Sequence, residues 1–232
     1  MSDDAELHRL MRQLAALNEI DYIIETGTYN GLGSTTAISE CFSGSQRLKK
    51  LYTIEVDYVN YTTAKRNLKN YPFVECVYGS SVNLRDAINF VENDTAIKNH
   101  LLYDNIFIDN IEDPVSFYIN ELKGKLIDKN AGFLQKIFRP SRKPDLLNTL
   151  INKLLPGTLF IVLDSAGGVG HLEFQIVQKN LSEADYYILL DDIHHLKHFR
   201  DFETIRTNKE FKLLGFSEEN GWALAKHSFL PE

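Results

Sequence analysis

Apolar and polar positions along this chain follow two periods, one typical of helices and one typical of buried strands. Residues 3–17 place leucines and a methionine at helical spacing, which predicts an amphipathic helix with Asp3 or Asp4 as its N-cap. Short apolar runs at 21–26, 50–56, 73–78, 158–164 and 186–192 predict strands, and segments with helical character lie between most of them. This alternation predicts an α/β fold with a doubly wound, mostly parallel sheet.

The end of the chain departs from this alternation. Residues Phe211–Phe216 and Gly221–His227 predict an antiparallel pair joined by a turn, which closes a seven-stranded sheet. Asn105–Asp109 is an alternative fourth strand, which would make Asp109 the first of the strand-end acids and 158–164 the fifth strand. The assignment of 158–164 as the fourth strand is preferred because it leaves the right number of strands for the hairpin. Residues 93–155 contain the polar stretch Lys123–Asp145 and fit the pattern least. We expect them to form an insertion, covering substrate, within a single domain of residues 1–232.

Composition narrows the classes of function. The net charge of −7 argues against a nucleic-acid partner, which would require a basic face. No apolar run reaches the roughly 18 residues that span a bilayer, and the N-terminus is acidic, so we expect a cytoplasmic protein with no membrane association. Neither Cys41 nor Cys76 has metal-type spacing, and both are expected to be buried thiols.

A glycine-rich turn follows the first predicted strand. Glu25 precedes Gly27, Gly31 and Gly33, and Ser34 opens the next helix, where free backbone N–H groups favour an anion. The spacing differs from the dinucleotide pattern Gly-x-Gly-x-x-Gly. It resembles motif I of the class I S-adenosylmethionine-dependent methyltransferases, although the glycines could serve only close packing. The resemblance implies that S-adenosylmethionine lies over the turn, near Gly27, Thr28, Tyr29, Gly33 and Ser34, and that Glu25 holds its amino group.

Two further strand ends fit the same cofactor. Glu55 ends the second predicted strand, where a carboxylate can accept both ribose hydroxyls of a nucleoside. Ser80 and Ser81 follow the third strand, and the resemblance places them beside the adenine. Both positions also have a simpler interpretation, as caps of the helices that follow.

Carboxylates gather at two later strand ends. Asp164 ends one strand, and Asp191 and Asp192 end its expected neighbour. Three converging carboxylates repel one another unless a cation lies between them, and Mg²⁺ prefers such ligands. This pattern resembles the metal site of catechol-type and macrocin-type O-methyltransferases and of the cephalosporin hydroxylase family. It predicts Asp164, Asp191 and Asp192 as metal ligands, with Asp164 also beside the cofactor; the alternative is that the acidic pair only caps a helix.

The general base is open at this point. The catechol enzymes carry a lysine shortly after the first metal aspartate, whereas this chain has Ser165-Ala166-Gly167-Gly168. Histidine titrates near neutral pH, and a lysine can act as a base only if its pKa is lowered. The candidates are His171, His195, Lys197 and His198, of which His195 and His171 are preferred. The stretch 194–198 could instead be only a solvated loop, and the histidines could instead bind Zn²⁺.

These features together predict an enzyme that transfers a methyl group from S-adenosylmethionine to a hydroxyl of a small molecule, such as a sugar or secondary metabolite, assisted by Mg²⁺ or a similar cation. The alternatives are a nicotinamide-dependent oxidoreductase and a non-catalytic nucleoside-binding protein. The aromatic stretch Tyr58–Tyr71 is a possible surface for homo-oligomers.

Overall fold

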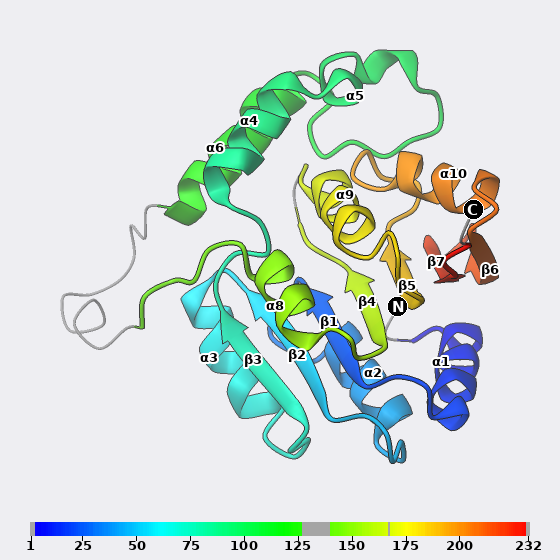
Figure 1. Ribbon diagram of the computed structural model, residues 1–232. Coiled ribbons are helices and arrows are strands. Elements are labelled where there is room, and N and C mark those ends of the chain that lie inside the picture. Colours follow the sequence, from blue (N-terminus) through cyan, green and yellow to red (C-terminus); the bar gives the residue numbers. More distant parts are fainter. Residues whose placement is uncertain (1–2, 127–139, 167, 231–232) are drawn as a thin grey trace.

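The computed structural model describes residues 3–126, 140–166 and 168–230. Its centre is one seven-stranded sheet with the strand order β3-β2-β1-β4-β5-β7-β6 (Figure 1). Strands β1 to β5 are parallel, whereas β7 is antiparallel to both β5 and β6. The predicted fold class is therefore confirmed. The strands are β1 (Tyr22–Thr26), β2 (Lys50–Glu55), β3 (Val74–Tyr78), β4 (Leu159–Leu163), β5 (Tyr186–Asp191), β6 (Phe211–Ser217) and β7 (Trp222–His227).

Successive side chains of the central strands point to opposite faces, and helices bury both faces. Ile23 packs into a cluster with the first two helices, whereas Ile24 packs into a second cluster on the other face. This two-sided burial explains why the parallel strands read as continuous apolar runs in the sequence. The first cluster includes side chains of α1 (Ala5–Leu17) and α2 (Ser34–Phe42), and the second includes side chains of α8 (Leu146–Leu154), α9 (Gly170–Asn180) and α10 (Phe199–Thr207).

One acidic side chain caps the first helix and also bonds to the last strand of the chain. Asp4 is the N-cap of α1, and its Oδ1 accepts a hydrogen bond of 2.8 Å from the backbone N–H of Leu7. Its Oδ2 accepts a second bond, of 2.6 Å, from the indole N–H of Trp222 in β7. Asp4 therefore joins the start of the chain to the closing hairpin.

The predicted fourth strand is β4, and the alternative at Asn105–Asp109 is not a strand of the sheet. Phe107 forms only an isolated bridge with His195. This short pairing brings a segment from the middle of the chain to the loop after β5.

The regular alternation is interrupted after β3 by a helical insertion, which we define as residues 84–126. Its helices α4 and α6 lie side by side beyond the sheet (Figure 1). Asp94 caps α5 and accepts two hydrogen bonds, of 2.9 and 3.1 Å, from the guanidinium of Arg200 in α10. The insertion contains α4 (Leu84–Asn93), α5 (Thr95–Lys98), the 3₁₀ turn η1 (His100–Leu102) and α6 (Pro114–Leu126).

The end of the predicted insertion belongs to the core instead. Helix α8 buries Leu147 and Ile151 against the sheet. Just before it, the backbone N–H of Ser80 donates to the carbonyl of Lys143 at 2.9 Å, so this part of the predicted excursion pairs with the end of β3. Residues 127–139 of the excursion lie outside the described residues. None of the helices seen in the described ranges has both the length and the apolar character needed to cross a membrane.

Candidate functional site

Two adjoining cavities lie at the carboxyl ends of the strands, where open α/β sheets bind their ligands. The glycine cavity, of about 440 Å³, is lined by the glycine turn and the ends of β2 and β3. The histidine cavity, of about 520 Å³, is lined by the loop after β5 and the turn between β6 and β7. Both are lined by Glu121, Asp164 and Ala166, so these residues mark where the cavities meet.

The glycine turn requires two of its glycines for different reasons. Gly27 has φ +88°, and a Cβ atom there would lie 2.1 Å from the carbonyl oxygen of Asp164. Gly31 has φ +79°, and a Cβ atom there would lie 2.8 Å from the side chain of Leu68. Such positive φ values and close approaches favour glycine. The turn is thus packed between the end of β4 and helix α3 (Tyr58–Asn67) with its C-cap Leu68.

Glu25 supports this turn from within the protein. Its side chain is fully buried, and its Oε2 accepts hydrogen bonds of 2.6 Å from the hydroxyls of Thr35 and Thr53. Burial raises the pKa of Glu25, and the hydroxyl hydrogen bonds oppose that shift. Because Glu25 does not line the glycine cavity, its position suits a role in holding β1, β2 and α2 together rather than a direct contact with a ligand.

Glu55 does line the glycine cavity. Its Oε2 accepts a 2.7 Å hydrogen bond from the backbone N–H of Tyr29, and its Oε1 accepts one of the same length from the backbone N–H of Asp57. The carboxylate is therefore oriented by the glycine turn on one side and the start of α3 on the other. Asp57 is the N-cap of α3, so the two acids have different roles.

The other predicted cofactor residues divide into two groups. Thr28 is buried, Gly33 is the N-cap position of α2, and Ser34 begins that helix; none of the three lines the cavity. Helix α6 adds lining residues that the sequence did not indicate, because nothing in its pattern places it over this edge of the sheet: Tyr118, Glu121 and Leu122. The predicted residues that line the cavity are Gly27, Tyr29, Glu55, Ser80, Ser81 and Asp164.

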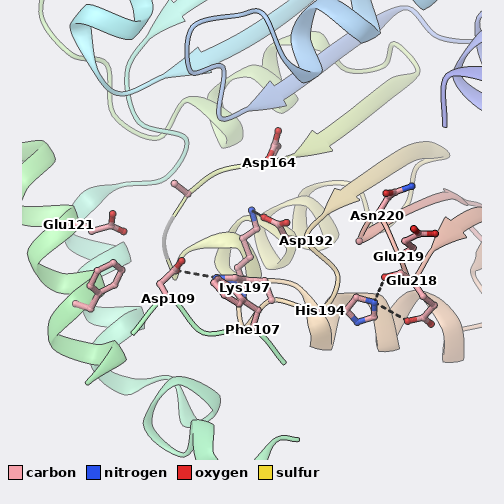
Figure 2. A pocket seen from close by; sticks show the side chains of 14 residues that line it. Phe107, Asp109, Glu121, Asp164, Asp192, His194, Lys197, Glu218, Glu219 and Asn220 are labelled. Carbon is pink, nitrogen blue, oxygen red and sulfur yellow. Dashed lines mark hydrogen bonds and ion pairs between the residues drawn. The ribbon is translucent and has the colours of Figure 1, made fainter. Parts of the chain in front are cut away.

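The histidine cavity contains an acid–histidine pair. His195 Nδ1 accepts a 3.0 Å hydrogen bond from the backbone N–H of Lys197. The proton of the neutral ring is therefore on Nε2, which donates to Asp109 Oδ2 at 3.1 Å (Figure 2). Burial lowers the pKa of His195, and the nearby charge of Asp109 only partly opposes this. The sequence suggested Asp109 only within the alternative strand assignment, as the strand-end acid that would be the first metal ligand.

Lys197 extends from the same loop toward the carboxylates (Figure 2). Its Nζ lies 2.8 Å from Asp192 Oδ2 and donates to the carbonyl of Ser165 at 3.1 Å. Burial alone would lower the pKa of Lys197, but the charges of Asp192, Asp164 and Asp191 outweigh it and raise the pKa. Lys197 is therefore a stable cation, which does not suit the general-base role predicted for it.

The predicted metal ligands do not form a ligand set. Burial and the charge of Asp191 raise the pKa of Asp164, whereas Asp192 is turned toward Lys197 and its pKa is lowered by that ammonium against the effect of burial. In the part of the chain that the structure describes, no group of three or more His, Cys, Asp or Glu side chains could hold a metal ion. The Lys197 ammonium lies beside these carboxylates.

Two of the predicted bases lie away from both cavities. His171 Nδ1 donates to Asp201 Oδ1, and His198 Nδ1 donates to Asp201 Oδ2 at 2.7 Å. Asp201 and His198 are completely buried between α9 and α10. This cluster joins the two helices, and neither histidine reaches a cavity wall.

Comparison of the sequence with models of known protein families finds no match, and comparison with curated proteins finds none either. Solved structures do match. An O-methyltransferase from Bacillus cereus in complex with SAH is 14% identical, with 97% of this chain and 82% of that chain covered and a TM-score of 0.50. The O-methyltransferase TomG from Streptomyces achromogenes, in complex with SAM, is 14% identical over 97% and 81% of the two chains, with a TM-score of 0.48. An rRNA methylase from Streptococcus thermophilus is 11% identical over 99% and 100%, with a TM-score of 0.44. The first of these similarities shows that the chain has the methyltransferase fold.

Proposed function

We propose that this chain, which has the fold of class I methyltransferases, transfers a methyl group from S-adenosylmethionine to a hydroxyl of a small molecule. The observation that carries the proposal is the meeting of two cavities at Asp164, Ala166 and Glu121. One cavity has the features of a nucleoside site, and the other has a proton acceptor. Methyl transfer requires these two compartments in direct contact, because the donor and acceptor atoms must approach within bonding reach.

The glycine cavity has donors and acceptors that suit S-adenosylmethionine. Glu55 offers carboxylate oxygens that two backbone N–H groups already orient, as recognition of ribose hydroxyls requires. Ser80 and Ser81 offer small polar contacts, and Ile54, Val82 and Leu122 offer apolar walls for a base. When bound there, S-adenosylmethionine supplies an electrophilic methyl group.

The histidine cavity supports the acceptor half of the reaction. Asp109 is the carboxylate that takes the proton of the acceptor hydroxyl, and His195 is a positioning residue whose Nε2–H holds that carboxylate. Phe107 and Phe117 add aromatic walls that suit a planar or apolar acceptor. At about 520 Å³, the cavity has the size of small-molecule sites.

The sheet also disfavours the oxidoreductase alternative. Classic dinucleotide-binding sheets have the parallel order 3-2-1-4-5-6. Here the antiparallel strand β7 lies between β5 and β6. The glycine spacing and the strand order therefore both point away from a nicotinamide site.

The test has two steps. Calorimetric titration with S-adenosylmethionine, with NAD⁺ as the control ligand, is expected to show saturable binding of the first alone. Incubation with radiolabelled S-adenosylmethionine and a panel of phenols, catechols, sugars and hydroxylated amines then identifies the acceptor. If S-adenosylmethionine does not bind, the proposal fails.

A further inference from the structure

Lys197 lies where several acidic side chains need a counter-charge. The parallel strands β4 and β5 end at the same edge of the sheet, which brings Asp164 close to Asp191, and Asp192 follows directly in the chain. Like charges at such short range are unfavourable inside a protein. The Lys197 ammonium contacts Asp192 at 2.8 Å, and the charges of Asp164 and Asp191 act on it as well.

The Lys197 side chain is held firmly in this position. Its side chain is only 5% exposed. A buried ammonium is costly unless its hydrogen bonds are satisfied, and Asp192 and the Ser165 carbonyl accept two of them. Around it the loop is tightly packed, since a Cβ atom at Gly170 would lie 3.0 Å from Lys197 Cβ and 2.7 Å from His198 Cε1.

The same residue faces the histidine cavity. Lys197 is among its lining residues, and an ammonium has three N–H donors, two of which are used by Asp192 and Ser165. The backbone N–H of Lys197 also fixes the tautomer of His195. Lys197 thus contributes its positive charge to the cavity and, through its backbone N–H, orients the His195 ring that holds Asp109.

We infer that Lys197 is the built-in cation of this site, with its ammonium in the place and in the electrostatic role of a divalent metal ion. Its third N–H holds the acceptor oxygen, and its charge favours the deprotonated form of that oxygen, as a bound metal ion does by lowering a ligand's pKa. The identity of that oxygen rests on the proposed function. The presence of the Lys197 counter-charge among the aspartates does not depend on the proposed function.

The test measures metal binding directly. Mn²⁺ is titrated into the full chain while electron paramagnetic resonance reports free Mn²⁺, which needs no substrate. Wild type is expected to show no saturable binding up to about 1 mM. Lys197→Met removes the charge and keeps most of the stem, so the uncompensated carboxylates are expected to bind Mn²⁺ at least about tenfold more tightly. Adding Asp192→Asn to Lys197→Met is expected to abolish this gain.

Lys226→Met is the matched control, because Lys226 also pairs with a carboxylate, Glu19 at 3.5 Å, but lines neither cavity. It is expected to bind no Mn²⁺. Saturable binding by wild type that Asp192→Asn removes would overturn the inference, and that arm decides the question even if Lys197→Met does not fold. A folded Lys197→Met with no added affinity would overturn it as well. Titration of wild type with S-adenosylmethionine tests the proposed function separately, so the two failures are distinguishable.

Discussion

Asp109 Oδ2 lies 3.1 Å from Nε2 of His195, although 86 positions of the chain separate the two residues. The bridge between Phe107 and His195 makes this possible, because it lays the segment after η1 along the loop after β5. The acid–histidine pair therefore forms only when the helical insertion is packed against the loop after β5. A change that loosens the insertion would separate the two side chains.

Replacing Asp109 by asparagine removes the proposed proton acceptor and keeps the side-chain shape. With the acceptor molecule that the panel identifies, Asp109→Asn is expected to lower kcat by about 10²- to 10⁴-fold. Binding of S-adenosylmethionine is expected to stay within about twofold, because Asp109 does not line the glycine cavity. Asp104→Asn, at an exposed position in the same segment, is the control. If Asp109→Asn has the same kcat as wild type, Asp109 is not the proton acceptor.

Glu55→Gln replaces the carboxylate at the end of β2 by an uncharged amide. The charged acceptor for the ribose hydroxyls is lost, and hydrogen bonds to charged groups contribute about 1.5–3 kcal/mol. Calorimetry is therefore expected to show S-adenosylmethionine binding weakened by about ten- to a hundredfold. The matched control is Glu75→Gln, a half-exposed acid on the neighbouring strand that pairs only loosely, at 3.7 Å, with Lys50. Equal affinities of Glu55→Gln and wild type would remove Glu55 from the cofactor site.

The positions of Glu55 and Asp109 differ in how well they can be predicted from the sequence. Glu55 follows a buried apolar run directly, and strand ends of a parallel sheet meet at one edge, so its place is predictable. Asp109 follows a run that resembles a strand but joins no sheet. Its position depends on packing of the helical insertion through Tyr118, Val91 and Leu196, which no local pattern encodes.

The metal prediction illustrates a second limit. The sequence places Asp164, Asp191 and Asp192 at adjoining strand ends, and carboxylates that converge in this way require a positive charge between them. The inference that the Lys197 ammonium meets this requirement depends on the path of the loop after β5, which the sequence pattern does not give. That loop directs the Lys197 ammonium inward, 2.8 Å from Asp192, while His198 is drawn away to Asp201. Lys197 and His198 are adjacent in the sequence, but one side chain contacts Asp192 at the cavity and the other contacts the buried Asp201.

Gly27→Ala is expected to destabilise the fold strongly. Its φ of +88° is unfavourable for alanine, and the added Cβ would lie 2.1 Å from the backbone oxygen of Asp164. We expect the free energy of unfolding to fall by about 2–4 kcal/mol, measured by urea titration followed by circular dichroism. Gly124→Ala is the control, since nothing lies within 4 Å of a Cβ there and the site is within α6. Gly124→Ala is expected to raise the free energy of unfolding by about 0.5–1 kcal/mol. Equal stabilities of the two variants would contradict the packing of the turn against β4.

Asp21 is expected to contribute stability that is lost in acid. Its hydrogen bond with Arg47 lowers its pKa to about 2, burial opposes that shift, and Lys49 and the backbone N–H of Thr158 lower the pKa further. Because the folded pKa lies below the unfolded value of 3.8, this stability is complete above about pH 4 and disappears as the pH falls through about 2. Asp21→Asn is therefore expected to melt at a lower temperature than wild type at pH 6, with a difference that shrinks toward pH 2. The control is Asp104→Asn, at an exposed position, whose melting temperature is expected to follow wild type throughout. A difference between Asp21→Asn and wild type that stays constant from pH 6 to pH 2 would show that Asp21 acts through packing rather than charge.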